Sequence, residues 1–262
     1  MRKILVIGAG NMGEAIVRAA ISRQVFDPKN TFVLDMNTEK CSALSSELGI
    51  SLGNPEDCDT VLLAVKPQHL SSALPAKTAE NPLLISVLAG TGTKTLQDIS
   101  GTNRICRVMP NTPALVGAGI SALFFSPEIS TDDQVFCQNL FSATGGTIEL
   151  KNEDDMHAVT ALSGSGPAYF FRFVELLSES GVWMGLPREM AEELAKKTFI
   201  GSAKLLEETG ESAEILRQKV TSPRGTTAAA LQSFAENNLG KVIQEALFAA
   251  QKRSKELGGE KG

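Results

Sequence analysis

The chain has 262 residues, of which 42% are apolar and 21% charged, with a formal net charge of −5 and a pI near 5.3. This mild acidity argues against nucleic acid and against an anionic membrane as partners. No apolar run reaches the roughly 20 residues that a membrane-spanning helix needs, and the four cysteines and two histidines lack the spacing of a metal site. We therefore expect a cytoplasmic protein that holds no metal and acts on a small molecule.

The first 21 residues combine a strand, a glycine loop and a helix. Lys3–Ile7 is a short apolar run typical of a buried parallel strand. It leads into Gly8, Ala9, Gly10, Asn11, Met12 and Gly13, and then into residues 14–21, which have helical spacing. In this order the glycines allow a tight turn, a close approach of a pyrophosphate and close packing of the helix on the strand. The N–H groups at the helix start can receive phosphates, so this segment is predicted to bind a dinucleotide cofactor.

The second predicted strand, Thr31–Leu34, is followed by Asp35. In this architecture an acidic residue at that place can accept hydrogen bonds from the ribose hydroxyls of the adenosine, which favours NAD over NADP. An alternative is that Asp35 only caps a helix beginning near Thr38. Both interpretations stay open at this point.

Strands and helices alternate as far as residue 151. Further strands are predicted at 59–65, 83–88, 104–109, 120–125 and 147–150, with helices at 39–48 and 131–142. This pattern predicts a doubly wound α/β sheet, whose ligands bind beyond the carboxyl ends of the strands. The residues at those strand ends that we assign to the cofactor cleft are Ala64, Val65, Lys66, Pro67, Ala89, Gly90 and Asn111. We also assign Asn37 and Asn54 to it.

From residue 152 onward only helices are predicted, at 155–162, 168–183, 188–208, 213–220, 226–237 and 241–257. Gly181, Gly185, Gly210 and Gly240 are expected to end helices, and Pro187 to start one. We therefore expect two domains, a dinucleotide-binding domain at 1–151 and a helical domain at 152–262.

Three segments combine glycine, hydroxyl residues and proline, namely Met109–Pro113, Leu162–Ala168 and Thr221–Ala228. The third would place backbone N–H groups and hydroxyls at a helix start, which suits a carboxylate. Taken singly, each segment also fits ordinary helix capping. His69 and His157 are more often packed or solvated than catalytic, so the reaction should need little proton abstraction.

Over nearly its whole length the sequence resembles pyrroline-5-carboxylate reductase. The matching motifs are Ile7–Gly13, Ala64–Pro67, Arg107–Pro113, Leu162–Tyr169 and Val220–Thr227. The resemblance implies an N-terminal Rossmann domain and a helical domain that binds substrate and interlocks with a second subunit. It also implies reduction of the cyclic imine 1-pyrroline-5-carboxylate to L-proline by NADPH or NADH. The chain departs from the family pattern at Asp35-Met36-Asn37 and at Arg224, where glycine is usual.

For this reaction we expect Ser222, Gly225 and Thr226 to hold the substrate carboxylate, and the Thr227 hydroxyl to bind the ring nitrogen. Ser222 and Thr227 are our catalytic candidates. Ser163, Gly164 and Ser165 are assigned to the substrate site. The helix at 167–177 is apolar around most of its circumference and must be buried on nearly all sides, which predicts a homodimer or a ring of dimers.

Two other functions share part of this sequence pattern. A β-hydroxyacid dehydrogenase would resemble this plan but carry a catalytic lysine on the first helix of its second domain, and residues 163–172 contain none. A non-enzymatic dinucleotide-binding protein would need the glycine loop but not the Ser222–Thr227 segment.

Overall fold

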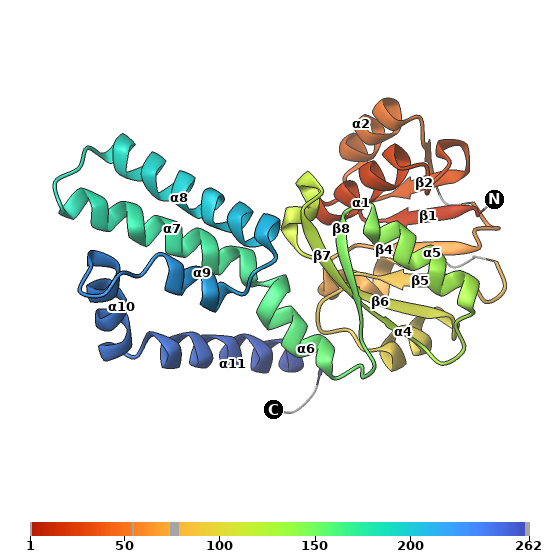
Figure 1. Ribbon diagram of the computed structural model, residues 1–262. Coiled ribbons are helices and arrows are strands. Elements are labelled where there is room, and N and C mark those ends of the chain that lie inside the picture. The colour runs from red at the N-terminus through yellow and green to blue at the C-terminus, as the bar shows by residue number, and fades with distance from the viewer. Residues whose placement is uncertain (1, 54, 74–78, 260–262) are drawn as a thin grey trace. The chain divides into compact units, whose positions relative to one another are not determined.

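The structure, a computed structural model, describes residues 2–53, 55–73 and 79–259 and divides into two compact units (Figure 1). We call Met1–Ser165 together with Ala249–Gly262 the sheet unit, and Gly166–Phe248 the helical unit. The expected boundary lay at 151/152. The sheet unit extends further because α6 (Asp155–Val159) packs against the sheet, and because the end of the C-terminal helix α11 (Leu239–Leu257) also belongs to it.

Among the described residues, eight strands form one sheet in the order β3-β2-β1-β4-β5-β6-β7-β8. Neighbouring strands are parallel except β6 and β7, which are antiparallel. The strands are β1 (Ile4–Ile7), β2 (Thr31–Leu34), β3 (Ser51–Leu52), β4 (Thr60–Leu63), β5 (Leu83–Ser86), β6 (Ile105–Met109), β7 (Gly119–Phe125) and β8 (Gly145–Glu149). This sheet confirms the doubly wound α/β fold.

Helices cover both faces of the sheet because alternate residues of each central strand point to opposite sides. Ile4 and Val6 face a core shared with α1 (Asn11–Ser22), α2 (Thr38–Leu48) and α5 (Thr131–Ser142). Leu5 and Ile7 face a second core completed by α3 (Leu70–Ala73) and α4 (Thr93–Ser100). The near-continuous apolar strands predicted from the sequence are thus buried on both sides.

The helix α4 was not predicted, and its capping explains why. Its N-cap is Gly92, which has no side chain to bond the first turn. Instead Glu153 accepts hydrogen bonds from both the backbone N–H and the hydroxyl of Thr93, each at 2.6 Å. A cap supplied from 60 residues further along the chain leaves no local signal in the sequence.

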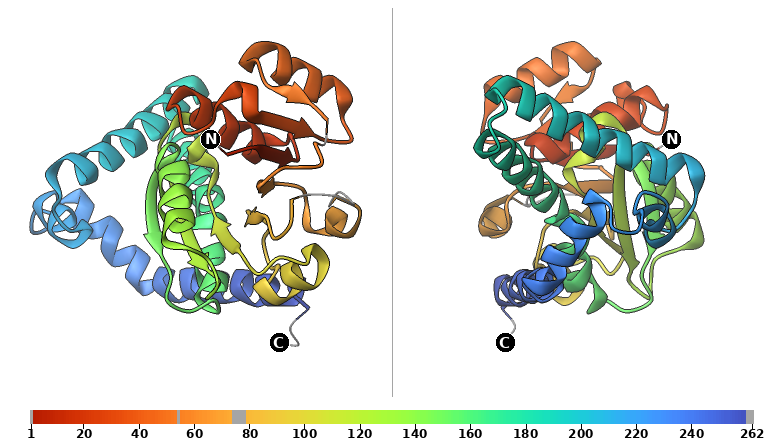
Figure 2. Two further views of the ribbon diagram at one scale, coloured as in Figure 1. Left: turned by 90° about the vertical axis from the view of Figure 1, so that its right-hand side faces the viewer. Right: turned by 60° about the vertical axis from the view of Figure 1, so that its left-hand side comes forward.

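The helical unit contains α7 (Gly166–Trp183), α8 (Arg188–Thr209), α9 (Ala213–Lys219), α10 (Thr226–Glu236) and the first half of α11. The helices α7 and α8 lie side by side in an antiparallel pair (Figure 2). Gly185, Pro187 and Gly210 lie at helix ends as predicted. Gly181 and Gly240 instead lie within helices. A Cβ on Gly181 would lie 3.0 Å from the Cβ of Ala191, so this glycine permits the close approach of α7 and α8.

The helical unit buries very little of its own apolar surface. Within Gly166–Phe248, all of which is described, the buried apolar side chains are those of Ala191 and Ala195. On α7, by contrast, Phe170 and Phe171 are 56% and 61% exposed. A single copy of the chain therefore does not supply the cover that the sequence predicts for α7. No helix in the described part of the chain has both the length and the apolar character to span a bilayer.

Candidate active site

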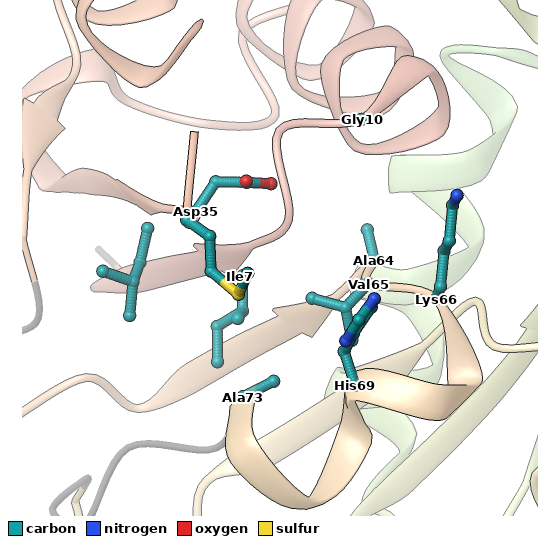
Figure 3. Close-up of a pocket in the computed structure, with 10 residues that line it drawn as sticks. Ile7, Gly10, Asp35, Ala64, Val65, Lys66, His69 and Ala73 are labelled. Carbon is teal, nitrogen blue, oxygen red and sulfur yellow. The ribbon is translucent and has the colours of Figure 1, made fainter. Parts of the chain in front are cut away.

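A pocket of about 430 Å³ opens at the carboxyl ends of β1, β2 and β4 (Figure 3). Its walls are formed by Ile7, Gly10, Leu34, Asp35, Met36, Ala64, Val65, Lys66, His69 and Ala73. The pocket thus brings together residues predicted for the cofactor from three separate segments of the chain. Asp35 lies on one side of the pocket, with Lys66 and His69 on the other (Figure 3).

The glycine loop has the geometry that a bound pyrophosphate requires. Gly8 has φ +108°, and a Cβ there would lie 2.6 Å from the backbone of Ala64. A Cβ on Gly13 would lie 2.0 Å from the carbonyl oxygen of Gly8, so α1 can pack this closely only on glycine. At Gly10, by contrast, a Cβ would meet nothing within 4 Å, so the backbone here is open to a ligand.

The start of α1 presents its backbone donors without a side-chain cap. Gly10 is the N-cap residue and makes no side-chain hydrogen bond. Asn11 and Met12 form the first turn, three residues earlier than the predicted helix began, and Met12 packs its side chain against the core. Together with the helix dipole, these N–H groups suit the phosphates of a dinucleotide.

Asp35 fixes the glycine loop. Its Oδ2 accepts a hydrogen bond from the backbone N–H of Ala9 at 2.7 Å, and its Oδ1 accepts one from the N–H of Asn37 at 2.9 Å. The cap of α2 is Asn37, whose side chain accepts a hydrogen bond from the N–H of Lys40. The structure therefore assigns the cap to Asn37 rather than to Asp35. A carboxylate oxygen can accept more than one hydrogen bond, so Asp35 can still bind ribose hydroxyls.

Other predicted cofactor residues lie further along the same edge of the sheet. Pro67 begins the short 3₁₀ turn that follows Lys66. Ala89 and Gly90 lie in the loop after β5, where Gly90 has φ +74°. Asn111 follows β6, and its Oδ1 accepts a hydrogen bond from the N–H of Ile120 at 3.0 Å. These residues follow β4, β5 and β6, so they lie progressively further from Asp35 along the sheet.

Sequence reasoning did not assign Ile7, Leu34, Met36, His69 and Ala73 to the pocket. Ile7 and Leu34 are the last residues of their strands, so the rule that ligands bind at strand ends could have found them. From the sequence His69 is expected to be packed or solvated, whereas in the structure its side chain lines the pocket (Figure 3). Asn54 lies outside the described residues.

The first predicted substrate segment forms a π-helical turn, Thr160–Gly164, between α6 and α7. We expected a break here. Instead Ser163 Oγ donates to the carbonyl of Val159 at 3.2 Å, and the N–H of Ser165 donates to that of Thr160 at 2.8 Å. A Cβ on Gly164 would lie 3.0 Å from the Sδ of Met109, so this turn rests against the end of β6. Single π-helical turns often mark functional sites.

The second predicted substrate segment, Ser222–Thr227, lies in the helical unit at the start of α10. Gly225 is the N-cap and makes no side-chain hydrogen bond, so the first-turn N–H groups are uncapped by a side chain. The hydroxyl of Ser222 leans over Gly225, where a Cβ would lie 2.4 Å from it. Arg224 has φ +61°, a conformation that favours glycine. This loop gathers a hydroxyl and backbone donors in one place, which suits a carboxylate.

An ion pair between a buried arginine and a partly buried glutamate braces the edge of the sheet. Arg107 is buried in β6 and pairs with Glu153, which also caps α4 through Thr93. Burial raises the pKa of Glu153, but the hydrogen bonds from Thr93 and Arg107 outweigh it and hold the pKa below its usual 4.5. Glu153 is therefore ionised at neutral pH and fixes the end of the loop that contains Ala89 and Gly90.

Comparison with known proteins identifies the family. A family model described as pyrroline-5-carboxylate reductase dimerisation matches residues 153–257, and one described as NADP oxidoreductase, coenzyme F420-dependent, matches residues 3–90. The chain is 39% identical over 260 residues to a pyrroline-5-carboxylate reductase of Synechocystis, which covers 97% of both chains. It resembles the solved structure of the reductase from Coxiella burnetii with a TM-score of 0.88 and 34% identity, covering 100% of this chain and 99% of that one. It also resembles the Plasmodium falciparum enzyme with NADP bound, with a TM-score of 0.79, 29% identity and 98% of each chain covered. The chain therefore belongs to the pyrroline-5-carboxylate reductase family.

Proposed function

We propose that this chain reduces 1-pyrroline-5-carboxylate to L-proline with NADPH or NADH. The proposal rests on one combination of observations. The chain matches this family over 97% of its length, its glycine loop is open at Gly10, and the helix start at Ser222–Thr227 has no side-chain cap. We place the activity in the cytoplasm, since the four cysteines are free thiols, as a reducing compartment favours.

The sheet unit supplies the groups that hold the cofactor. Gly10 and the start of α1 receive the pyrophosphate, and Asp35 accepts hydrogen bonds from the adenosine ribose. The apolar pocket walls, Val65 and Met36 among them, receive the adenine. Ala89, Gly90 and Asn111, further along the edge, face the nicotinamide half. When bound, the reduced nicotinamide supplies the hydride that the imine carbon accepts.

The helical unit supplies the groups that orient the substrate. Ser222 and the backbone N–H groups of Gly225 and Thr226 hold the carboxylate, and the Thr227 hydroxyl bonds the ring nitrogen. A cyclic imine is basic enough to be partly protonated near neutral pH, so no strong acid is needed. Orientation alone can lower the barrier by about 7–11 kcal/mol. Ser163, Gly164 and Ser165, which belong to the sheet unit, are further substrate-binding candidates in this proposal.

The active form in this proposal is a homodimer or a ring of dimers. Two observations support it, the match to a dimerisation family model and the exposed aromatic residues of α7. A two-fold interface built from the helical unit would resemble a domain core divided between two copies. In that arrangement each active site combines the cofactor pocket of one subunit with the Ser222–Thr227 loop of the other.

Turnover tests the function directly. The purified chain should oxidise NADPH or NADH when 1-pyrroline-5-carboxylate is added, and L-proline should accumulate in equal amount. Cofactor binding without turnover would instead indicate a non-enzymatic dinucleotide-binding protein, and turnover of β-hydroxyacids alone would indicate a dehydrogenase. For the shared site, an inactive Gly10→Asp variant and an inactive Thr227→Ala variant should recover part of the activity when their subunits are exchanged. No recovery despite proven exchange would exclude shared sites.

A further inference from the structure

The last turn of α11 packs on the loop that follows β5. Leu257 and Gly258 belong to the sheet unit, as does Gly90 in that loop. A Cβ on Gly90 would lie 3.0 Å from both the Gly258 nitrogen and the Leu257 Cβ. In the other direction, a Cβ on Gly258 would lie 2.4 Å from the carbonyl oxygen of Gly90. The two segments are therefore in close contact. Gly258 leaves no room for a Cβ, and Gly90 has φ +74°, a conformation that favours glycine.

This C-terminal turn is itself anchored to the sheet unit. Ser254 is buried and its Oγ lies 2.9 Å from the Nδ1 of His157 on α6, which is also buried. The N–H of Gly258 donates to the carbonyls of Ser254 and Lys255, at 3.2 and 2.9 Å, which closes the turn. The contact with Gly90 is thus made by a fixed turn rather than by a loose chain end.

The same loop is held at its other end by Glu153, which bonds the N–H and hydroxyl of Thr93. The two attachments are at Gly90 and Thr93, and Thr91 and Gly92 lie between them. A segment with two glycines does not hold one conformation by itself. The shape of the loop is therefore set by its two anchors, and the C-terminal turn is one of them.

The position of the loop decides what it can affect. In the strand order β2-β1-β4-β5, the proposed ribose site at Asp35 follows β2 and the proposed pyrophosphate site at Gly10 follows β1. A dinucleotide that continues in this direction brings its nicotinamide half toward the loop after β5. We infer that Leu257 and Gly258 are positioning residues that hold Ala89 and Gly90 in place for the nicotinamide half of the cofactor. This inference rests on the cofactor binding proposed above.

Gly258→Ala tests the inference. The added methyl would lie 2.4 Å from a backbone oxygen where an ordinary contact is 3.4–4 Å, so the turn and the loop must separate by about 1 Å. A misplacement of that size can cost about a hundredfold in rate. We expect kcat/KM to fall by at least about tenfold and the Kd for NADH to rise. The Kd for ADP, which has adenosine and two phosphates but no nicotinamide, should stay at its wild-type value.

Two comparisons make the result decisive. Gly146→Ala is the matched control, because a Cβ there would make only an ordinary contact of 3.5 Å with Ile120. Ser254→Ala should raise the Kd for NADH, as Gly258→Ala does. Ser254→Thr keeps the hydroxyl and should bind NADH with wild-type affinity. Wild-type affinity for NADH in Gly258→Ala, or equal weakening of NADH and ADP, would overturn the inference. The proposed function is judged separately, on the turnover of the wild-type chain.

Discussion

The choice between NADH and NADPH should depend on the charge of Asp35. Asp35→Asn keeps the size of the side chain and removes its negative charge. An amide can accept through only one oxygen, so it can keep only one of the two hydrogen bonds that the carboxylate accepts from Ala9 and Asn37. The substitution should therefore weaken the use of NADH, and it should also remove the repulsion that a 2′-phosphate of NADPH would meet.

The size of the effect follows from the surroundings of Asp35. Two unit charges 4 Å apart interact with about 1 kcal/mol in water and about 4 kcal/mol near a protein surface. Asp35 is half-buried in an open pocket, so its interaction lies between these limits. Since about 1.4 kcal/mol corresponds to a factor of ten, the NADPH to NADH ratio of kcat/KM should rise about tenfold.

Steady-state kinetics with both cofactors measures this ratio. Asp98→Asn is the matched control, because it removes one negative charge from the exposed surface of α4. The effect of Asp35→Asn should also shrink as salt is added, because ions screen the interaction between charges. A ratio that stays at its wild-type value, in a variant that still folds, would mean that Asp35 only braces the glycine loop.

Three further predictions concern the substrate loop, the cofactor loop and acid stability. Thr227→Ala should lower kcat by about tenfold, which corresponds to the loss of one hydrogen bond. The free energy of unfolding should change by about 0.5 kcal/mol or less. Full activity in this variant would remove the Thr227 hydroxyl from the mechanism. Gly13→Ala should abolish the stabilisation of the fold by NADPH in thermal unfolding, because its Cβ would lie 2.0 Å from Gly8 O, and wild-type stabilisation would contradict this. Burial raises the pKa of Asp133, but Arg2, Ser130 and Arg104 outweigh it and hold the pKa below its usual 3.8. A carboxyl whose pKa is lower in the folded chain stabilises it fully above the unfolded value and loses that effect as the pH falls through the folded value. The free energy of unfolding should thus drop below about pH 4, and Asp133→Asn should flatten that drop; an unchanged slope would show that Asp133 does not contribute.

Local patterns were enough to predict the sheet and the gathering of several candidate residues at one of its edges. The apolar strands and the spacing of Gly8, Gly10 and Gly13 are local signals, and a parallel sheet brings its strand ends to one edge regardless of detail. That is why Asp35 and Lys66, far apart in the sequence, could be assigned to one pocket, and the structure places them there.

What could not be predicted depends on contacts between distant residues. The helix α4 has its cap from Glu153, and the loop at Gly90 has its support from Gly258. The π-helical turn at Thr160–Gly164 replaces a break that the glycine and serine residues suggested. For α4 and the π-helical turn the local sequence favours a loop where the structure has a helix, and at Gly90 the contact that supports the loop lies far along the chain.

The thin core of the helical unit has a thermodynamic consequence. Two buried alanines contribute little of the burial that a compact unit of this length needs. If most of its stabilisation comes from association of two copies, the melting temperature must rise with protein concentration, as mass action requires. Dilution would then unfold the helical unit rather than release a stable folded subunit. The exposed aromatic residues of α7 would make any unassembled chain prone to aggregation. In the proposed dimer, assembly and folding of this unit are therefore one process.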